Sequence, residues 1–130
     1  MSMKDKLILR MRISSADIHY GGGLVPGSKI VGLFGDAATA LLIRKDGDEG
    51  LFAAYESIEF KAPVYAGDFL EIHALINNVG NSSRAMSFEA WKIIAANPQE
   101  GDSAADWLEE PQLVATAKAT CVVPKSRQRR

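Results

Sequence analysis

The chain has 130 residues, of which 47% are hydrophobic and 24% charged, and its formal net charge is −1. This size and balance predict a single globular domain covering residues 1–130, large enough to enclose a hydrophobic core. A net charge so close to zero does not indicate a nucleic-acid partner. The first apolar run is interrupted by Arg10 and Arg12, so it is too short for a signal peptide or a membrane span.

The first expected strand is 7–13, in which apolar residues alternate with polar ones. The stretch "HYGGGLVPGSKIVGLFGDAATALLIR" (19–44) follows, beginning with a glycine-rich loop and continuing with apolar residues at helical spacing. We expect the helix to begin at Ser28, which comes after Pro26-Gly27 and can cap its start. The helix should end near Arg44, a cation in the last turn with glycines beyond it.

Four further segments have the two-residue alternation of strands. They are 51–60, 70–76, 86–94 and 113–123. Short connections favour antiparallel pairing, and the polar segment 96–112 is expected to be a long loop. The order strand, helix, four strands predicts an α+β fold in which an antiparallel sheet of about five strands wraps around one long central helix.

The middle of the helix contains Gly32, Gly35 and Asp36, which do not favour a stable buried helix. Each glycine costs a helix roughly 1 kcal/mol relative to alanine, and a carboxylate is costly to bury without partners. We interpret the small residues as the walls of a shallow pocket into which Asp36 faces. The alternative is a helix edge that is open to water.

The single cysteine, Cys121, excludes an internal disulfide and fits a cytoplasmic protein. No histidine or basic residue stands next to it, so we interpret it as core packing and not as a nucleophile. The two histidines, His19 and His73, lack the spacing of metal ligands, and we expect no metal site.

Three segments resemble conserved parts of the hotdog-fold acyl-CoA enzymes: "GLVPGSKIVGLFGDAA" (23–38), "FKAPVYAGD" (60–68) and "GNSSR" (80–84). Two further stretches, "LLIRKDGDEGLF" (41–52) and "SAADWLEEP" (103–111), resemble the small 3-aminobutyryl-CoA and β-alanyl-CoA ammonia lyases. This resemblance implies reversible removal of ammonia from a β-aminoacyl-CoA to give the enoyl-CoA. It implies no cofactor apart from the coenzyme A of the substrate.

With such a substrate, we expect Asp36, Glu59 and His19 to be the catalytic residues. Two carboxylates could bind the substrate's ammonium group and take its α-proton, and Glu59 is favoured over Glu56 because it adjoins the "FKAPV" element. Amides of the glycine loop and the helix start would polarise the thioester oxygen. His19 and Tyr20 border this loop and could orient the substrate.

The coenzyme A part of the substrate has its own candidates. Lys61 and Arg84 could contact its phosphates, and Asn81 and Ser83 its pantetheine, although each could equally be a solvated surface residue. The basic tail "PKSRQRR" (124–130) is interpreted as a solvated end, with an anion contact as the alternative.

Two other functions stay open: an acyl-CoA thioesterase in which Asp36 is nucleophile or base, and a non-catalytic acyl-CoA-binding module. The resemblance also implies a homodimer joined edge to edge into one sheet, with the pocket between subunits. Dimers could associate further, for example into a hexamer, through apolar groups such as Trp91 and Ile93 on the outer sheet face.

Overall fold

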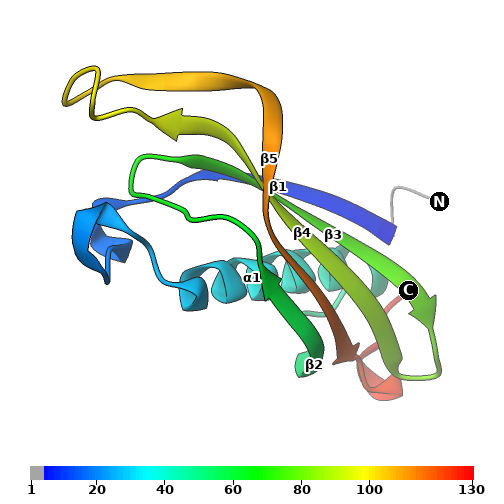
Figure 1. Ribbon diagram of the computed structural model, residues 1–130. Helices are drawn as coiled ribbons and strands as arrows, with labels where there is room; N and C mark the ends of the chain where they lie inside the picture. The colour runs from blue at the N-terminus through cyan, green and yellow to red at the C-terminus, as the bar shows by residue number, and fades with distance from the viewer. Residues whose placement is uncertain (1–4) are drawn as a thin grey trace.

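The computed structural model describes residues 5–130 as one five-stranded sheet with a long helix against it (Figure 1). The strands are β1 (Lys6–Arg12), β2 (Leu51–Phe60), β3 (Phe69–Val79), β4 (Ser83–Ala96) and β5 (Ala105–Val122). The helix α1 (Gly27–Asp46) lies between β1 and β2 in the chain. Short 3₁₀ turns occur at Ser15–Asp17, Gly21–Gly23 and Lys125–Arg127.

The strand order is β1-β3-β4-β5-β2 and all neighbours pair antiparallel, so β1 and β2 are the edges of the sheet. The expected α+β layout of five strands and one helix is confirmed. Among residues 5–130, no helix combines the length and the hydropathy needed to cross a bilayer.

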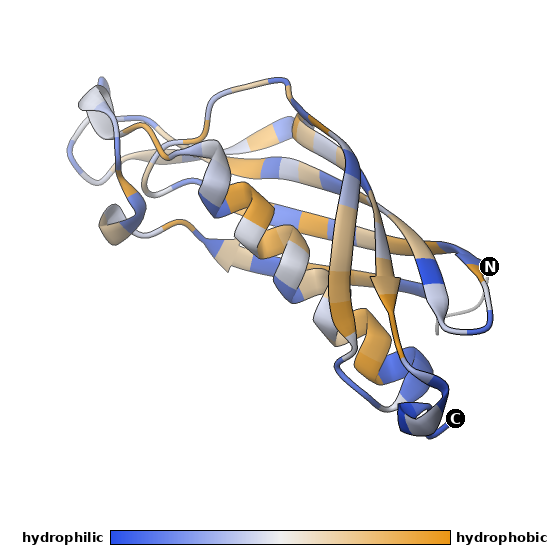
Figure 2. Ribbon diagram, turned by 90° about the horizontal axis from the view of Figure 1, so that it is seen from below, coloured by the Kyte–Doolittle hydropathy of each residue, from blue (hydrophilic) through white to orange (hydrophobic). Residues whose placement is uncertain are grey.

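The helix packs on one face of the sheet through apolar side chains that recur at helical spacing along its whole length (Figure 2). Its largest buried side chain, Phe34, stacks on Phe88 of β4 with 5.3 Å between ring centroids. The face of β5 beneath the helix consists of small residues. These are Ala115, Ala117, Ala119 and Cys121, all buried. Cys121 is therefore a core residue, as expected.

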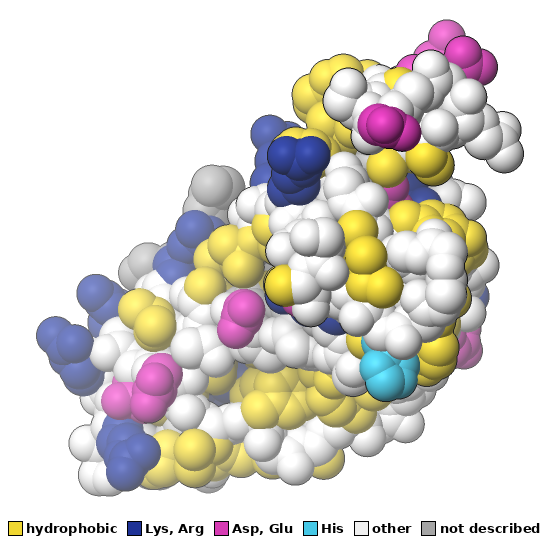
Figure 3. Space-filling model, turned by 90° about the vertical axis from the view of Figure 1, so that its left-hand side faces the viewer, with side chains coloured by type: hydrophobic (Ala, Val, Ile, Leu, Met, Phe, Trp, Pro, Cys, Tyr) yellow, Lys and Arg dark blue, Asp and Glu magenta, His cyan; other side chains and the backbone are white. Residues whose placement is uncertain are grey.

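The segment predicted to be a long loop is partly strand. β5 begins at Ala105, and its first part pairs with the end of β4, as in the pair Ile94–Trp107. The sequence of this part has no clean apolar alternation because the two-stranded arm that it forms projects beyond the helix (Figure 1). Acidic and hydrophobic side chains gather at the arm's end (Figure 3), and Trp107 is 75% exposed.

The start of the helix also differs from the expectation. The helix begins at Gly27 with Pro26 in the capping position, and no side chain accepts a hydrogen bond there. The expectation that Ser28 caps the helix is therefore wrong, because Ser28 already lies inside the first turn. The other end is as predicted, with Arg44 and Lys45 in the last turn and Gly47 in the left-handed conformation at φ 73°.

Candidate active site

Asp36 lies on the side of α1 that faces away from the sheet. The exposed residues of the helix recur every three or four positions and so form a single stripe. They are Ser28, Gly32, Asp36, Thr39 and Ile43, followed by Arg44. Within residues 5–130, Asp36 has neither a hydrogen bond nor an ion pair. Its carboxylate is therefore free to act on something outside this chain.

The two glycines beside Asp36 face open space. A Cβ added at Gly32 or Gly35 would meet no atom of the chain within 4 Å. The chain's own packing therefore does not require glycine at either position. The small-residue surface around Asp36 exists as predicted, but residues 5–130 leave it open to water, which matches the alternative interpretation.

The glycine loop is bound to the "FKAPVYAGD" segment at the start of the helix. Val25 N–H donates to the carbonyl of Val64 at 2.9 Å, and Ala66 N–H donates to that of Gly23 at 3.1 Å. Gly27 allows the helix start to pack directly against the Phe60 ring, since a Cβ would lie 2.6 Å from it. A hollow of about 550 Å³ opens here, and Tyr20 and Lys61 are among its lining residues.

Asp68 holds this segment in place. Its carboxylate is 1% exposed, accepts hydrogen bonds from the amides of Tyr65 (2.8 Å) and Ala96 (2.9 Å), and pairs with Lys92 at 3.0 Å. The Gly-Asp pair of the motif is therefore structural: it fixes the turn that carries the glycine loop. The sequence alone did not reveal this role, because the partners of Asp68 lie on other elements.

The helix start and Asp36 are too far apart to act on the same thioester within one chain. Nine residues separate Gly27 from Asp36, which corresponds to about 14 Å along the helix axis at 1.5 Å per residue. The α-carbon that loses a proton is bonded directly to the thioester carbonyl carbon. Amides at the helix start that polarise the carbonyl must therefore work with a carboxylate from elsewhere.

Glu59 lies on the face of the sheet that is turned away from the helix. It pairs with Thr116, which pairs with Glu89, and directly paired residues share a face. This row lies opposite the alanines of β5 that pack under the helix. Glu59 is also exposed and forms an ion pair with Lys61 at 3.0 Å. The sheet therefore separates Glu59 from the helix, which argues against Glu59 as the second working carboxylate beside Asp36 of the same chain.

Two bulges in β2 produce this arrangement. The pairing with β5 shifts between Phe52 and Ala54 and again between Tyr55 and Ser57, which leaves Glu56 without a paired residue. As a result, Phe52, Tyr55 and Ile58 face the helix at intervals of three residues instead of two. The Tyr55 hydroxyl donates to the Val31 carbonyl of α1 at 3.2 Å, and burial raises the pKa of this tyrosine. Strict alternation of side chains along β2, without the bulges, would instead place Tyr55 on the same face as Glu59.

Arg84 is buried and its charge is already neutralised within the chain. Its side chain is 3% exposed and binds the Asp46 carboxylate through Nε (2.9 Å) and Nη2 (2.8 Å). Nη1 donates to the carbonyls of Gly80 (3.0 Å) and Ser83 (2.9 Å). The expected phosphate contact is therefore corrected to a structural role. Asn81 lies in the turn between β3 and β4, and Ser83 is the first residue of β4; both are exposed.

His19 and Tyr20 lie at the entrance of the glycine loop. Both side chains are exposed, and their rings meet edge to face with centroids 4.7 Å apart. Both backbone amides donate to the Leu24 carbonyl at 3.2 Å, which closes the loop on itself. The sequence placed these residues beside the loop correctly, and nothing in the chain prevents their contact with a ligand in the adjoining hollow.

The sequence model of the family described as "Thioesterase superfamily" matches residues 22–93. The chain is 54% identical over 125 residues to the 3-aminobutyryl-CoA ammonia lyase of Acetoanaerobium sticklandii, covering 96% of this chain and 99% of that protein. The chain belongs to the thioesterase superfamily and, within it, to the family of this ammonia lyase.

Solved structures of this superfamily agree with the fold. The β-alanyl-CoA:ammonia lyase of Clostridium propionicum superposes with a TM-score of 0.89 at 44% identity, covering 95% of this chain and 88% of that one. A hexameric broad-specificity acyl-coenzyme A thioesterase has a TM-score of 0.74 at 22% identity and covers 92% and 81%. The second likeness shows the fold alone. The predicted hotdog-type fold is confirmed.

The two family matches cover different parts of the site. The thioesterase superfamily match includes the glycine loop, α1, β2 and most of β4, but ends before the arm and the C-terminal tail. The likeness to the ammonia lyases extends over nearly the whole chain. The elements outside the superfamily match are thus included in the likeness to the lyases.

Proposed function

We propose that this protein catalyses the reversible elimination of ammonia from a β-aminoacyl-CoA, of the 3-aminobutyryl or β-alanyl type, to give the enoyl-CoA. The observation that carries this proposal is the 54% identity to a 3-aminobutyryl-CoA ammonia lyase across 96% of the chain. The free carboxylate of Asp36 on a glycine-lined helix face supports it, because such a face leaves room for a ligand.

We infer that the working unit is a homodimer. β2 is an edge strand and exposes large apolar side chains, with Leu51 at 58% and Phe60 at 55%, which a soluble protein normally covers. Pairing of β2 with β2 of a second copy would extend the sheet and bring the second helix to the same side. The glycine loop and helix start of one chain would then face Asp36 of the other. In this arrangement the helix start and the carboxylate of one site come from different chains, so the distance of about 14 Å between Gly27 and Asp36 along one helix is no obstacle.

The chemistry follows from these positions. A carboxylate takes the α-proton of the substrate while amides of the glycine loop and helix start stabilise the negative charge on the thioester oxygen. The Cβ–N bond then breaks, its electron pair leaves with the nitrogen as ammonia, and the α,β double bond forms. In the reverse direction ammonia adds to Cβ and the carboxylic acid returns the proton. No metal or redox cofactor takes part.

For the second carboxylate we propose Glu56. It stands at a bulge on the exposed edge of β2, next to Tyr55, whose hydroxyl contacts the helix one and a half turns from Asp36. A carboxylate at this edge adjoins the proposed dimer interface, where its partner chain would desolvate it. We assign the binding of the substrate's ammonium group to Glu56 and proton transfer to Asp36.

An assay with crotonyl-CoA and ammonium separates the candidate functions. Loss of the enoyl absorbance without free thiol is the result expected for the lyase. Release of free thiol would instead identify a thioesterase, and binding without reaction would identify an acyl-CoA-binding module. Acrylyl-CoA in a parallel reaction distinguishes the β-alanyl from the 3-aminobutyryl substrate.

We further propose a cytoplasmic location, where acyl-CoA substrates occur and where a free cysteine such as Cys121 stays reduced. Association of dimers into a hexamer would use the outer sheet face that carries Trp91. Size determination by light scattering at several protein concentrations tests both steps of assembly, since a stable active monomer contradicts the shared site.

A further inference from the structure

A hollow of about 520 Å³ lies at the C-terminal end of α1, on the opposite end of the helix from the glycine loop. It is formed where the turn between β3 and β4 meets the last residues of the chain. Its polar lining comes from Lys45, Asp46, Asn81, Arg84, Lys125, Gln128 and Arg130. The hollow therefore combines four cationic side chains and one carboxylate with two amides.

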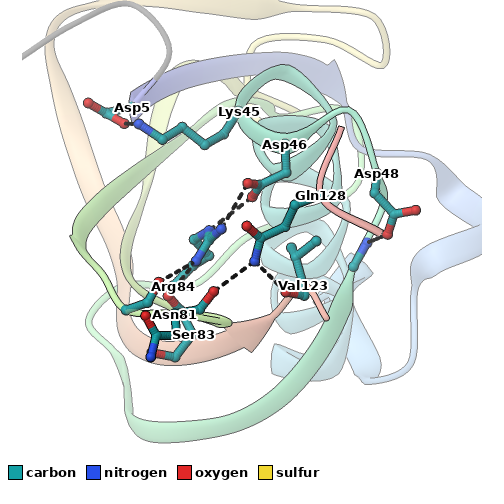
Figure 4. Close-up of polar contacts among 11 residues, drawn as sticks. Asp5, Lys45, Asp46, Asp48, Asn81, Ser83, Arg84, Val123 and Gln128 are labelled. Atoms are coloured by element: carbon teal, nitrogen blue, oxygen red, sulfur yellow. Dashed lines mark hydrogen bonds and ion pairs between the residues drawn. The ribbon is translucent and has the colours of Figure 1, made fainter. Parts of the chain in front are cut away.

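The tail that forms one wall is packed onto the fold (Figure 4). The Gln128 side-chain amide donates to the carbonyls of Asn81 (2.8 Å) and Val123 (3.0 Å). Arg129 N–H donates to the Asp46 carbonyl at 2.9 Å, and its guanidinium donates to that of Gly47 at 3.1 Å. The tail is therefore anchored to the fold, while the side chains of its cationic residues stay exposed, as expected for a solvated end. These bonds fix the backbone that carries the neighbouring cations.

The charges of this region leave two cations without an acidic partner. Arg84 at the base of the hollow is neutralised by Asp46, and Lys45 pairs with Asp5 at 2.8 Å. Within residues 5–130, neither Lys125 nor Arg130 has a carboxylate at ion-pair distance. Two unpaired cations beside amide donors make a site for a multiply charged anion, and phosphate is the chemistry that such donors suit best.

We propose that this hollow binds the phosphate groups of the coenzyme A part of the substrate, with Lys125 and Arg130 as the cationic contacts. The proposal rests on the proposed function. Its geometry fits: ten residues separate Asp36 from Asp46, which is about 15 Å along the helix. An extended pantetheine arm spans a distance of this order. A thioester beside Asp36 thus places its nucleotide at the tail, whereas Lys61 lies at the other end of the helix.

Kinetics with two substrates test the assignment. Crotonyl-CoA and crotonyl-pantetheine carry the same acyl group, but only the first has phosphates. For Lys125→Gln with Arg130→Gln, we expect the KM for crotonyl-CoA to rise about tenfold with kcat unchanged, as for the loss of charge-assisted hydrogen bonds. The KM for crotonyl-pantetheine should stay the same. Arg127→Gln is the matched control, because Arg127 is exposed on the same tail and does not line the hollow.

An equal rise in KM for both substrates would overturn the proposal, since it would show that the two residues support the fold of the site. If the double variant does not fold, Lys125→Gln alone keeps the test valid, because this side chain is exposed and has no partner among residues 5–130.

Calorimetry with 3′,5′-ADP separates this proposal from the reaction itself. We expect binding to the wild-type protein and to Arg127→Gln, and at least tenfold weaker binding to Lys125→Gln with Arg130→Gln. Binding of 3′,5′-ADP by a protein without lyase activity would keep the site and reject the function. Lyase activity without binding of 3′,5′-ADP would keep the proposed function and reject the phosphate site. Equal affinity for inorganic phosphate would overturn the assignment to coenzyme A.

Discussion

Arg84 and Asp46 connect the first residues of β4 to the last residue of α1 through two parallel hydrogen bonds, and both side chains are less than 5% exposed. A bidentate pair of this kind holds the helix end in one orientation and neutralises two buried charges at once. The remaining N–H groups of Arg84 bind carbonyls of the β3–β4 turn. This pair therefore fixes the helix end, the turn and, through the Asp46 carbonyl, the tail.

Breaking this pair should destabilise the protein strongly. Asp46→Asn leaves the Arg84 guanidinium buried without its counter-charge, and we expect the free energy of unfolding to fall by about 3–5 kcal/mol. Urea denaturation measures this change. Glu49→Gln, an exposed neighbour, should shift it by less than about 0.5 kcal/mol. Asp46→Leu combined with Arg84→Met should recover much of the loss, and a failure to recover would show that the pair is not the cause.

Asp36→Asn should fold normally and lose most activity. The side chain is exposed and has no partner in the part of the chain that the structure describes, so the midpoint of unfolding should not change. Loss of a proton-transferring carboxylate should lower kcat by about 10²- to 10⁴-fold. The exposed Glu109 on the arm is a suitable control, and Glu109→Gln should keep full turnover. A variant Asp36→Asn with near wild-type turnover contradicts the assignment.

Substitution of the two glutamates of β2 should reduce turnover to different extents. Glu56→Gln should reduce turnover far more than Glu59→Gln, because the sheet separates Glu59 from the helix and Lys61 already pairs with it. Steady-state kinetics of both variants measure this difference in turnover. Equal losses, or a larger loss for Glu59→Gln, would return the role to Glu59 and reject the argument from the bulge.

Subunit mixing tests the shared site. Asp36→Asn should be inactive, and so should Gly22→Val, because Gly22 has φ of 73° and a branched side chain is strained there. If Asp36 and the glycine loop of one site come from different chains, a mixed dimer holds one intact site. Activity should then return in part once the chains exchange, which labelled subunits can confirm. Proven exchange without recovery would place both elements in one chain's site.

Cys121 should not react in the folded protein. The side chain is fully buried in the core beneath the helix, and burial raises the pKa of its thiol to about 11. At pH 8 the thiol is therefore protonated and inaccessible to Ellman's reagent. We expect no fast reaction in native buffer and one thiol per chain in guanidinium, in agreement with the single cysteine of the sequence. The protein itself would then add no background to the thiol-release assay.

Hydropathy alternation and helical spacing were enough to predict the order of the elements, because the apolar face of each strand and of α1 points into one core. The same spacing located Asp36 on the helix, and it identified the interval of β2 (51–60) without error. These features depend on each segment's own sequence, so they are visible before the chain folds.

The face of Tyr55, the unpaired position of Glu56, the partner of Arg84 and the position of the tail were decided only by tertiary structure. Alternation gives the right face for Glu59 but the wrong face for Tyr55, because two bulges in β2 add residues that no local pattern announces. An arginine and an aspartate 38 residues apart become a buried pair only when β4 reaches the helix end. A polar, basic tail looks solvated until hydrogen bonds from Gln128 and Arg129 attach it to carbonyls on other elements. Each of these outcomes depends on which groups the fold brings within contact distance.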